Sequence, residues 1–177
     1  MSPVLRLLCA LLLLASAAWP VHARRLALVV GNEAYQRVAR LDRPVNDAEA
    51  LAAVLQAAGF EVTLGRDLAQ GPLRQAVDDF RARVRGDDEV VVFFAGHGVQ
   101  TARGAYLLPV DTAGDTEAQV EQTALALQTL LGGLDAARPR HALVVVAACR
   151  DNPFRAAGRA LGAARGLTAP PVGRGQV

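Results

Sequence analysis

The sequence predicts an α/β protein built around a mainly parallel β-sheet. Short apolar runs occur at 25–31, 90–94 and 143–148, and the last two have the unbroken apolar character of strands buried on both faces. Segments with apolar residues at helical spacing separate these runs, and glycine or proline marks most of the boundaries. Strands that alternate with helices indicate parallel strands joined by helical crossovers.

The first 23 residues have the pattern of a secretory signal peptide. Arg6 provides a positive charge, residues 7–15 form an apolar run, and Val21-His22-Ala23 matches a small-x-small cleavage site. The apolar run is too short to span a membrane, which argues against the alternative of an uncleaved membrane anchor. We therefore expect cleavage after Ala23, a periplasmic or secreted protein, and no stable membrane span in the mature chain.

The predicted elements follow one another without an internal repeat. After the strand at 25–31, a helix begins with Asn46 as its N-cap and Glu49 completing a capping box, and it ends at Gly59. A strand at 60–64 completes a βαβ unit. The later expected elements are a helix from Pro72 to Gly86, a strand at 90–94, a short hairpin arm at 104–110, a polar loop at 111–121, a helix around 127–134 and a strand at 143–148.

Composition narrows the range of functions. The formal net charge is +2, which gives no reason to expect nucleic-acid binding. Every basic residue is an arginine, so Walker-type lysines and Schiff-base chemistry are excluded. After cleavage Cys149 is the only cysteine and has no partner for an intramolecular disulfide. A lone thiol in an exported protein indicates either a reactive group or a bond to another chain.

Two chemically active residues follow the two unbroken apolar runs. His97, flanked by glycines, comes after 90–94, and Cys149 comes directly after 143–148. The carboxyl ends of parallel strands form one edge of a sheet, so the two side chains meet if their strands are neighbours. A thiolate beside an imidazolium is an effective nucleophile, and the histidine then protonates a leaving amine. The N–H groups of Gly98 and Cys149 are candidates for an oxyanion hole, so the pattern points to acyl transfer.

Both residues also have a purely structural interpretation. A cysteine at the end of an apolar strand is often a small buried residue, and lone histidines are often structural. The other histidine of the mature chain, His141, lies at the opposite end of the Cys149 strand. We expect His141 to be structural or exposed, and remote from the thiol.

Several stretches of the chain form a recognisable set. They are Ala95-Gly96-His97-Gly98 and Ala148-Cys149-Arg150-Asp151-Asn152-Pro153-Phe154, with the supporting stretches 28–32 and Tyr35, 44–48, and 106–111. Together they resemble the caspase-like cysteine peptidases, specifically their bacterial, metacaspase-like branch, and the distance from histidine to cysteine is typical of that family. The resemblance covers about residues 25 to 154. It implies a caspase-haemoglobinase fold, a three-layer α-β-α sandwich, with a His97/Cys149 dyad and Gly98 in the oxyanion hole.

The resemblance also implies a substrate preference. Metacaspase-like peptidases cleave after Arg or Lys, and Asp47 matches one of their acidic substrate-binding residues. A carboxylate in the first turn of a helix is also favoured by the helix dipole, so Asp47 has a structural explanation as well. The family usually has a second acidic residue two positions before the cysteine, where this chain has Ala147. No cofactor or metal site is expected, although the resemblance to metacaspases raises the use of calcium.

A second departure from the family concerns the end of the chain. In the family, further strands and helices follow the cysteine strand, whereas this sequence ends at Val177. The expected plan is a signal peptide at 1–23, a truncated caspase-like catalytic domain at 24–154 and a low-complexity or disordered tail at 155–177. The strand at 143–148 is then an apolar sheet edge, open to self-association or to a partner.

Three alternatives to an active peptidase remain. The first alternative is that the chain is an inactive caspase-like pseudoenzyme or interaction domain. The second is that it is a truncated gene fragment. A nucleotide-binding domain is the third, and it lacks support because residues 30–33 form neither a Walker motif nor a G-x-G-x-x-G loop. The partner expected of an active enzyme is a peptide or protein substrate.

Overall fold

The computed structural model describes residues 23–114, 116–148, 153–156 and 167. The elements in chain order are β1 (Arg25–Gly31), α2 (Pro44–Ala57), β2 (Glu61–Arg66), α3 (Gln70–Arg83), β3 (Glu89–Gly96), β4 (Gly98–Thr101), β5 (Gly104–Leu107), α4 (Glu117–Thr123), β6 (Leu125–Ala126), α5 (Leu127–Ala137), β7 (His141–Ala148) and α6 (Pro153–Ala156). The expected signal peptide lies outside the described residues apart from Ala23, as does most of the expected tail.

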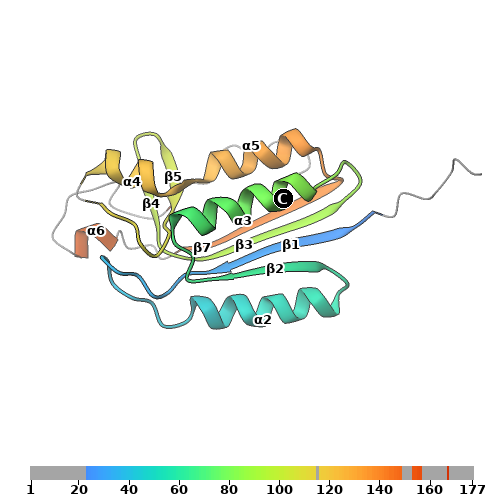
Figure 1. Cartoon of the computed structure of the whole chain (residues 1–177), viewed down its shortest axis with the longest axis horizontal. Coiled ribbons are helices and arrows are strands. Elements are labelled where there is room, and N and C mark those ends of the chain that lie inside the picture. The colour runs from blue at the N-terminus through green and yellow to red at the C-terminus, as the bar shows by residue number, and fades with distance from the viewer. Residues whose placement is uncertain (1–22, 115, 149–152, 157–166, 168–177) are drawn as a thin grey trace, which may run out of the picture.

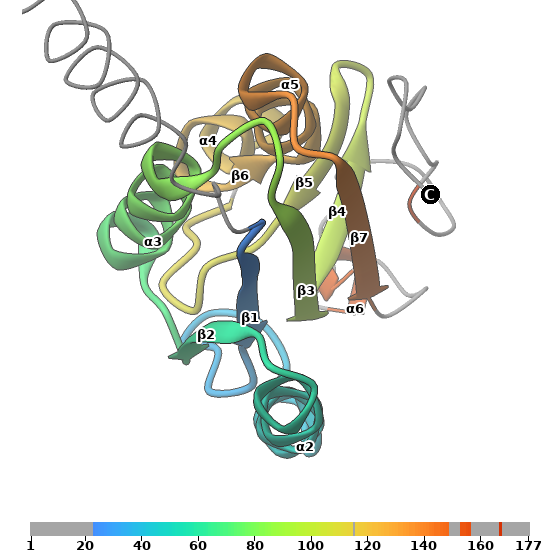
Figure 2. The ribbon, with the colours of Figure 1, turned by 90° about the vertical axis from the view of Figure 1, so that its right-hand side faces the viewer.

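A four-stranded parallel sheet in the order β2-β1-β3-β7 forms the centre of the fold. Figure 1 shows α2 on one face of this sheet and α3 and α5 on the other, which is a three-layer α-β-α sandwich. Figure 2 shows the same layers from the end of the sheet. The predicted fold class is therefore confirmed. Strands β4, β5 and β6 add a small antiparallel sheet beyond the carboxyl ends of the parallel strands.

Alternation along β1 divides the core between the two faces of the sheet. Leu26, Leu28 and Val30 pack with the apolar side chains of α3 and α5. Ala27 and Val29 belong to the cluster on the opposite face, where α2 contributes small residues (Ala48 and Ala52). All of these β1 side chains are at most 2% exposed. Burying each large aliphatic side chain contributes about 1.5–3 kcal/mol, so β1 is anchored on both faces of the sheet.

The start of α2 differs from the sequence prediction. The helix begins at Pro44, with Arg43 as its N-cap, so Asn46 lies inside the first turn and the expected capping box of Asn46 is wrong. Instead, Glu33 reaches across from the loop after β1, and its Oε2 accepts the N–H of Val45 at 3.2 Å. A carboxylate from a distant loop thus satisfies a donor that the N-cap residue leaves free. The predicted stop at Gly59 is confirmed, since its φ of +84° favours glycine.

The segment from 104 to 123 also departs from the prediction. The arm expected at 104–110 is a strand only over Gly104–Leu107, and it pairs with β4 and β6. The loop expected at 111–121 is partly wrong, because helix α4 begins at Glu117. Thr116 and Gln119 form a capping box there, a local signal that marks the start of the helix.

The two strands that precede His97 and Cys149, β3 and β7, differ in how many neighbouring strands they have. β3 has a neighbour on each side, as a central strand should, whereas β7 pairs with β3 alone among the described strands. On the face of β7 that points toward the α2 layer, Leu143 and Val145 are 43% and 39% exposed. The expected sheet edge is therefore present in the described part of the chain. Over that same part, no helix is long and apolar enough to cross a membrane.

Candidate active site

The predicted neighbourhood of the two reactive positions depends on the pairing of β3 with β7. These strands are parallel neighbours, and Gly96 is the register partner of Ala148. His97 and Cys149 are the residues that follow this pair in the sequence, so the prediction that their strands are adjacent is confirmed. Cys149 itself lies outside the described residues, and its catalytic role stays a prediction.

The imidazole of His97 is buried and held in one orientation. The residue is 4% exposed, and its Nε2 lies 2.8 Å from the carbonyl oxygen of Ala39. A carbonyl oxygen only accepts, so Nε2 carries the proton in the neutral ring and Nδ1 is left with a free lone pair. Nδ1 is buried and has no hydrogen-bond partner within the described residues. Burial lowers the pKa of His97, and the hydrogen bond to Ala39 offsets this only in part. Burial therefore favours the neutral form of the His97 imidazole.

Tyr35 fixes both the backbone and the ring of His97. Its hydroxyl accepts the N–H of His97 at 2.8 Å and donates to the carbonyl of Leu108 at 3.1 Å. Its ring lies against the imidazole, with 4.6 Å between the centroids. The N–H of Leu108 donates to the carbonyl of His97 at 3.0 Å, so the tyrosine hydroxyl takes the place of the second bond of this antiparallel pair.

Asn32 completes the network from the end of β1. The side chain is fully buried, accepts the N–H of Leu68 at 2.8 Å and donates to the carbonyl of Leu108 at 3.1 Å. Its backbone N–H donates to Ala95 at 2.9 Å. Because buried amides are costly unless paired, Asn32 ties the loops after β1, β2 and β5 to one another. The site histidine therefore rests on side chains from the loop after β1.

A side chain at either glycine beside His97 would meet neighbouring atoms. A Cβ on Gly96 would lie 2.6 Å from the hydroxyl of Tyr35. A Cβ on Gly98 would lie 2.7 Å from Cδ1 of Leu167 and 3.2 Å from Cβ of Ala148. Because the Leu108 N–H bonds the carbonyl of His97, the next pair along the ladder is a non-hydrogen-bonded one, and the N–H of Gly98 is directed away from β5. The part of Gly98 in an oxyanion hole stays a prediction.

The other predicted residues lie where their strands and helices place them. Asp47 is exposed in the first turn of α2, close to the carboxyl edge of the sheet, where Gly31 of β1 packs against the backbone of Pro44. Ala147 is exposed near the end of β7, and His141 is exposed at its start, remote from His97, as expected. The role of Asp47 in substrate binding stays a prediction.

Sequence reasoning gave no role to several residues that support His97. Asn32 and Tyr35 stand out only as polar and aromatic residues directly after a buried strand, which is a usable signal. The carbonyl of Ala39 has no signal at all, because any residue supplies a backbone oxygen. No cluster of three His, Cys, Asp or Glu residues suited to a metal ion occurs in the part of the chain that the structure describes.

Comparison with known proteins identifies relatives of this chain. A sequence model of the family described as the caspase domain (Peptidase_C14) matches residues 24–170. The human mucosa-associated lymphoid tissue lymphoma translocation protein 1 is 29% identical over 92 residues, which are 52% of this chain and 11% of that protein. Its mouse homolog is 28% identical over the same share of each chain. This chain therefore spans about a tenth of the length of these curated relatives.

One solved structure supports the architecture independently. The crystal structure of protein GSU0716 from Geobacter sulfurreducens superposes with a TM-score of 0.56 and 19% sequence identity, over 76% of this chain and 54% of that one. At this level of identity the likeness concerns the fold alone.

Proposed function

Because this chain belongs to the caspase domain family, we propose that it is a cysteine-type endopeptidase with Cys149 as its nucleophile and His97 as its general acid–base. The observation that carries the proposal is the register of β3 and β7, in which the residues before His97 and Cys149 are direct partners. The free, buried Nδ1 of His97 is the second support, since it leaves a proton acceptor available for the reaction.

The proposed reaction needs only the thiol, the imidazole and water. His97 takes the thiol proton at Nδ1, and the thiolate attacks the scissile carbonyl carbon. The N–H groups of Gly98 and Cys149 stabilise the oxyanion. Collapse of the intermediate breaks the C–N bond, and His97 delivers its proton to the leaving amine. Water then hydrolyses the thioester, which releases the carboxylate product and restores the thiol.

For specificity, we propose cleavage after Arg or Lys, as in the metacaspase-like branch that the sequence motifs resemble. In this proposal the carboxylate of Asp47, which is exposed in the first turn of α2, binds the basic side chain of the substrate. Ala147 removes the second carboxylate expected there, so we expect a weaker preference for a basic residue than two carboxylates would give. Comparing cleavage of peptides with Arg or Leu before the scissile bond tests this, with Asp47→Asn reducing the difference.

The further expectations about this protein are also proposals. We propose that it is exported and acts on peptide or protein substrates. Its proposed catalytic chemistry uses no cofactor. The resemblance to metacaspases suggests that calcium could activate the enzyme, and measuring activity with calcium and with a chelator tests this. These expectations are independent of one another, so each is tested on its own.

The second candidate function is a non-catalytic interaction domain, and the exposed edge of β7 favours it. Leu143 and Val145 present apolar surface on a strand that has one described neighbour. Such an edge favours pairing with a second copy or another protein. Sedimentation of the purified chain at increasing concentration tests self-association, and Val145→Glu should weaken any complex formed through this face.

Labelling of Cys149 with an arginyl chloromethylketone separates the two functions. We expect fast labelling that Cys149→Ala abolishes and that His97→Ala slows about 10²-fold or more, since a positioned acid–base typically contributes ~10²–10⁴-fold. His141→Ala is the matched control, because that histidine is exposed at the far end of β7. Labelling no faster than that of an ordinary exposed thiol would favour the interaction domain.

A further inference from the structure

Both backbone polar groups of Arg24, its N–H and its carbonyl, are hydrogen-bonded to other parts of the fold. It directly precedes β1, so it lies at the amino end of the parallel strands, whereas His97 follows the carboxyl end of β3. Figure 1 shows the parallel strands running side by side. Its carbonyl accepts the N–H of Glu89 at 2.9 Å, and its own N–H donates to Oδ1 of Asp88 at 3.1 Å. The preceding residue, Ala23, is exposed. Among the described residues, the backbone contacts between the β1 segment and the β3 segment therefore include Arg24.

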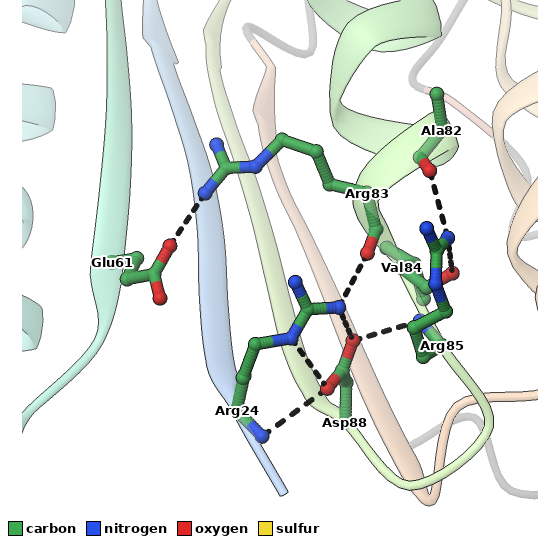
Figure 3. Close-up of polar contacts among 7 residues, drawn as sticks. All are labelled: Arg24, Glu61, Ala82, Arg83, Val84, Arg85 and Asp88. Carbon is green, nitrogen blue, oxygen red and sulfur yellow. Dashed lines mark hydrogen bonds and ion pairs between the residues drawn. The ribbon is translucent and has the colours of Figure 1, made fainter. Parts of the chain in front are cut away.

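The acceptor of this N–H is a buried carboxylate. Asp88 is 2% exposed, and its two oxygens also accept Nε and Nη2 of Arg24 at 3.2 and 2.7 Å and the N–H of Arg85 at 2.7 Å (Figure 3). Arg24 Nη2 donates further to the carbonyl of Arg83 at 2.6 Å. Burial alone would raise the pKa of Asp88, but the hydrogen bonds from Arg24 and Arg85 outweigh it and hold the pKa below its ordinary value. Asp88 is thus a negative charge aimed at the backbone nitrogen of Arg24.

An independent feature of the sequence points to the same peptide bond. Val21-His22-Ala23 ends a positively charged and apolar leader with small residues at the positions that precede export cleavage. The cut that this pattern predicts falls between Ala23 and Arg24. The first backbone nitrogen of the processed chain would then be the one that faces Asp88. We propose that the chain is processed between Ala23 and Arg24, and that the α-ammonium group created on Arg24 docks on the buried carboxylate of Asp88.

The chemistry of this step is a simple hydrolysis by an export-associated peptidase. Water adds to the carbonyl carbon of Ala23 and the C–N bond to Arg24 breaks. The Ala23 side leaves as a carboxylate, and the Arg24 nitrogen leaves with its electron pair and takes up protons to become an ammonium group. A neutral N–H donor is thereby replaced by a charged donor at the same position. The new ammonium group and the ionised Asp88 carboxylate carry opposite charges, and their added attraction strengthens the contact that starts β1.

The composition of the chain makes this group easy to observe. The sequence contains no lysine, so the α-amine is the only primary amine of the protein. A reagent that acylates amines therefore reports on this site alone. A neighbouring carboxylate raises the pKa of an ammonium group. The guanidinium of Arg24 binds the same carboxylate and repels the new charge, so we expect a rise in the pKa of the α-amine at the lower end of the usual range. A rise of one pKa unit makes acylation at neutral pH about tenfold slower.

The test uses the full chain, leader included, produced in a bacterium that exports it. We expect the purified protein to begin at Arg24 by mass spectrometry of its N-terminal peptide. We then expect acetylation by an N-hydroxysuccinimide ester to be about tenfold slower in the folded protein than in the same protein unfolded in denaturant. Asp88→Asn should bring the folded rate close to the unfolded rate. Glu89→Gln is the matched control, because that neighbouring carboxylate binds the side chain of Arg25 instead, at 2.9 Å.

Each outcome decides the proposal. A mature chain that starts at another residue, or that keeps its leader after export, overturns it. Equal acetylation rates in the folded and unfolded protein overturn it too. If Asp88→Asn does not fold, the pH dependence of the wild-type rate takes its place: a charge pair moves the midpoint of the rate to higher pH, whereas simple crowding slows the reaction without moving the midpoint. None of these measurements depends on peptidase activity, so the proposal and the proposed function fail separately.

Discussion

Replacing Tyr35 with phenylalanine tests how His97 is positioned. The substitution keeps the ring that packs against the imidazole and removes only the hydroxyl. That hydroxyl accepts the N–H of His97 at 2.8 Å and donates to the carbonyl of Leu108 at 3.1 Å. The Leu108 carbonyl keeps its bond from Asn32 at 3.1 Å, so the lasting loss falls on the N–H of His97, which is left buried without an acceptor.

The expected loss of stability follows from the one buried N–H that Tyr35→Phe leaves without an acceptor. Leaving one buried donor unpaired costs about 1–3 kcal/mol, so we expect Tyr35→Phe to lower the free energy of unfolding by about 2 kcal/mol. For a domain of this size that corresponds to a decrease in Tm of about 4–8 °C. A shift of the His97 backbone also misplaces Nδ1, and we expect labelling of Cys149 to slow about tenfold. The pH midpoint of labelling should not move, since Tyr35 does not bond the imidazole.

Denaturant unfolding and chloromethylketone labelling measure the two effects separately. Tyr106→Phe is the matched control, because Tyr106 is the only other tyrosine, is 8% exposed, and lies in β5. It should change stability without slowing the labelling. A double change adds a geometric test: Gly96→Ala places a Cβ 2.6 Å from the Tyr35 hydroxyl, so it should cost less in the Tyr35→Phe background. Wild-type stability and labelling in Tyr35→Phe would refute the proposed positioning.

Three further predictions concern the same fold. Burial holds the pKa of His97 below its unfolded value of about 6.5, so the stability contributed by its neutral form is complete above that pH and is lost as the pH falls through the lowered pKa. Urea midpoints should therefore drop as the pH is lowered below about 6.5, and His97→Gln should flatten the drop. Asp88→Asn should destabilise the fold by about 2 kcal/mol in urea unfolding at pH 7, because the Arg24 guanidinium loses its buried partner, and an unchanged midpoint would contradict this. Gly31→Ala places a Cβ 2.4 Å from the carbonyl oxygen of Pro44 and should cost about 1–3 kcal/mol, whereas its control Gly132→Ala, in open space on α5, should be neutral or stabilising by up to about 1 kcal/mol in thermal unfolding.

Local sequence patterns predicted most of the sheet and its helices. The apolar runs became β1, β3 and β7, and Gly59 ends α2 with the positive φ that the pattern predicts. These features are short in range: strand and helix periodicity and the conformational freedom of glycine are properties of a few neighbouring residues. The capping box of α4 at Thr116 was equally local and was overlooked because a run of polar residues suggested a loop.

Contacts between distant segments were beyond such reasoning. The N-terminus of α2 is capped by Glu33, 12 residues from its partner, so the pattern around Asn46 was misleading. Likewise the carbonyl of Ala39 is 58 residues from His97 in sequence, and a backbone oxygen leaves no trace in the sequence at all. A residue with a suitable local sequence pattern does not form the expected hydrogen bond when the fold brings another partner from a distant segment.

The sequence by itself determined the alternation of strands and helices and the position of His97 and Cys149 directly after two apolar runs, and it predicts a leader that is cleaved after Ala23. Only the tertiary structure decided that β3 and β7 are parallel neighbours in a register that pairs Gly96 with Ala148. It alone decided that Nδ1 of His97 is the ring nitrogen without a hydrogen-bond partner among the described residues, and that Asp88 faces the backbone of Arg24. The physical reason is that periodicity reports which face of a segment is apolar, whereas strand order, proton position and ion pairing depend on groups that meet only after the chain has folded.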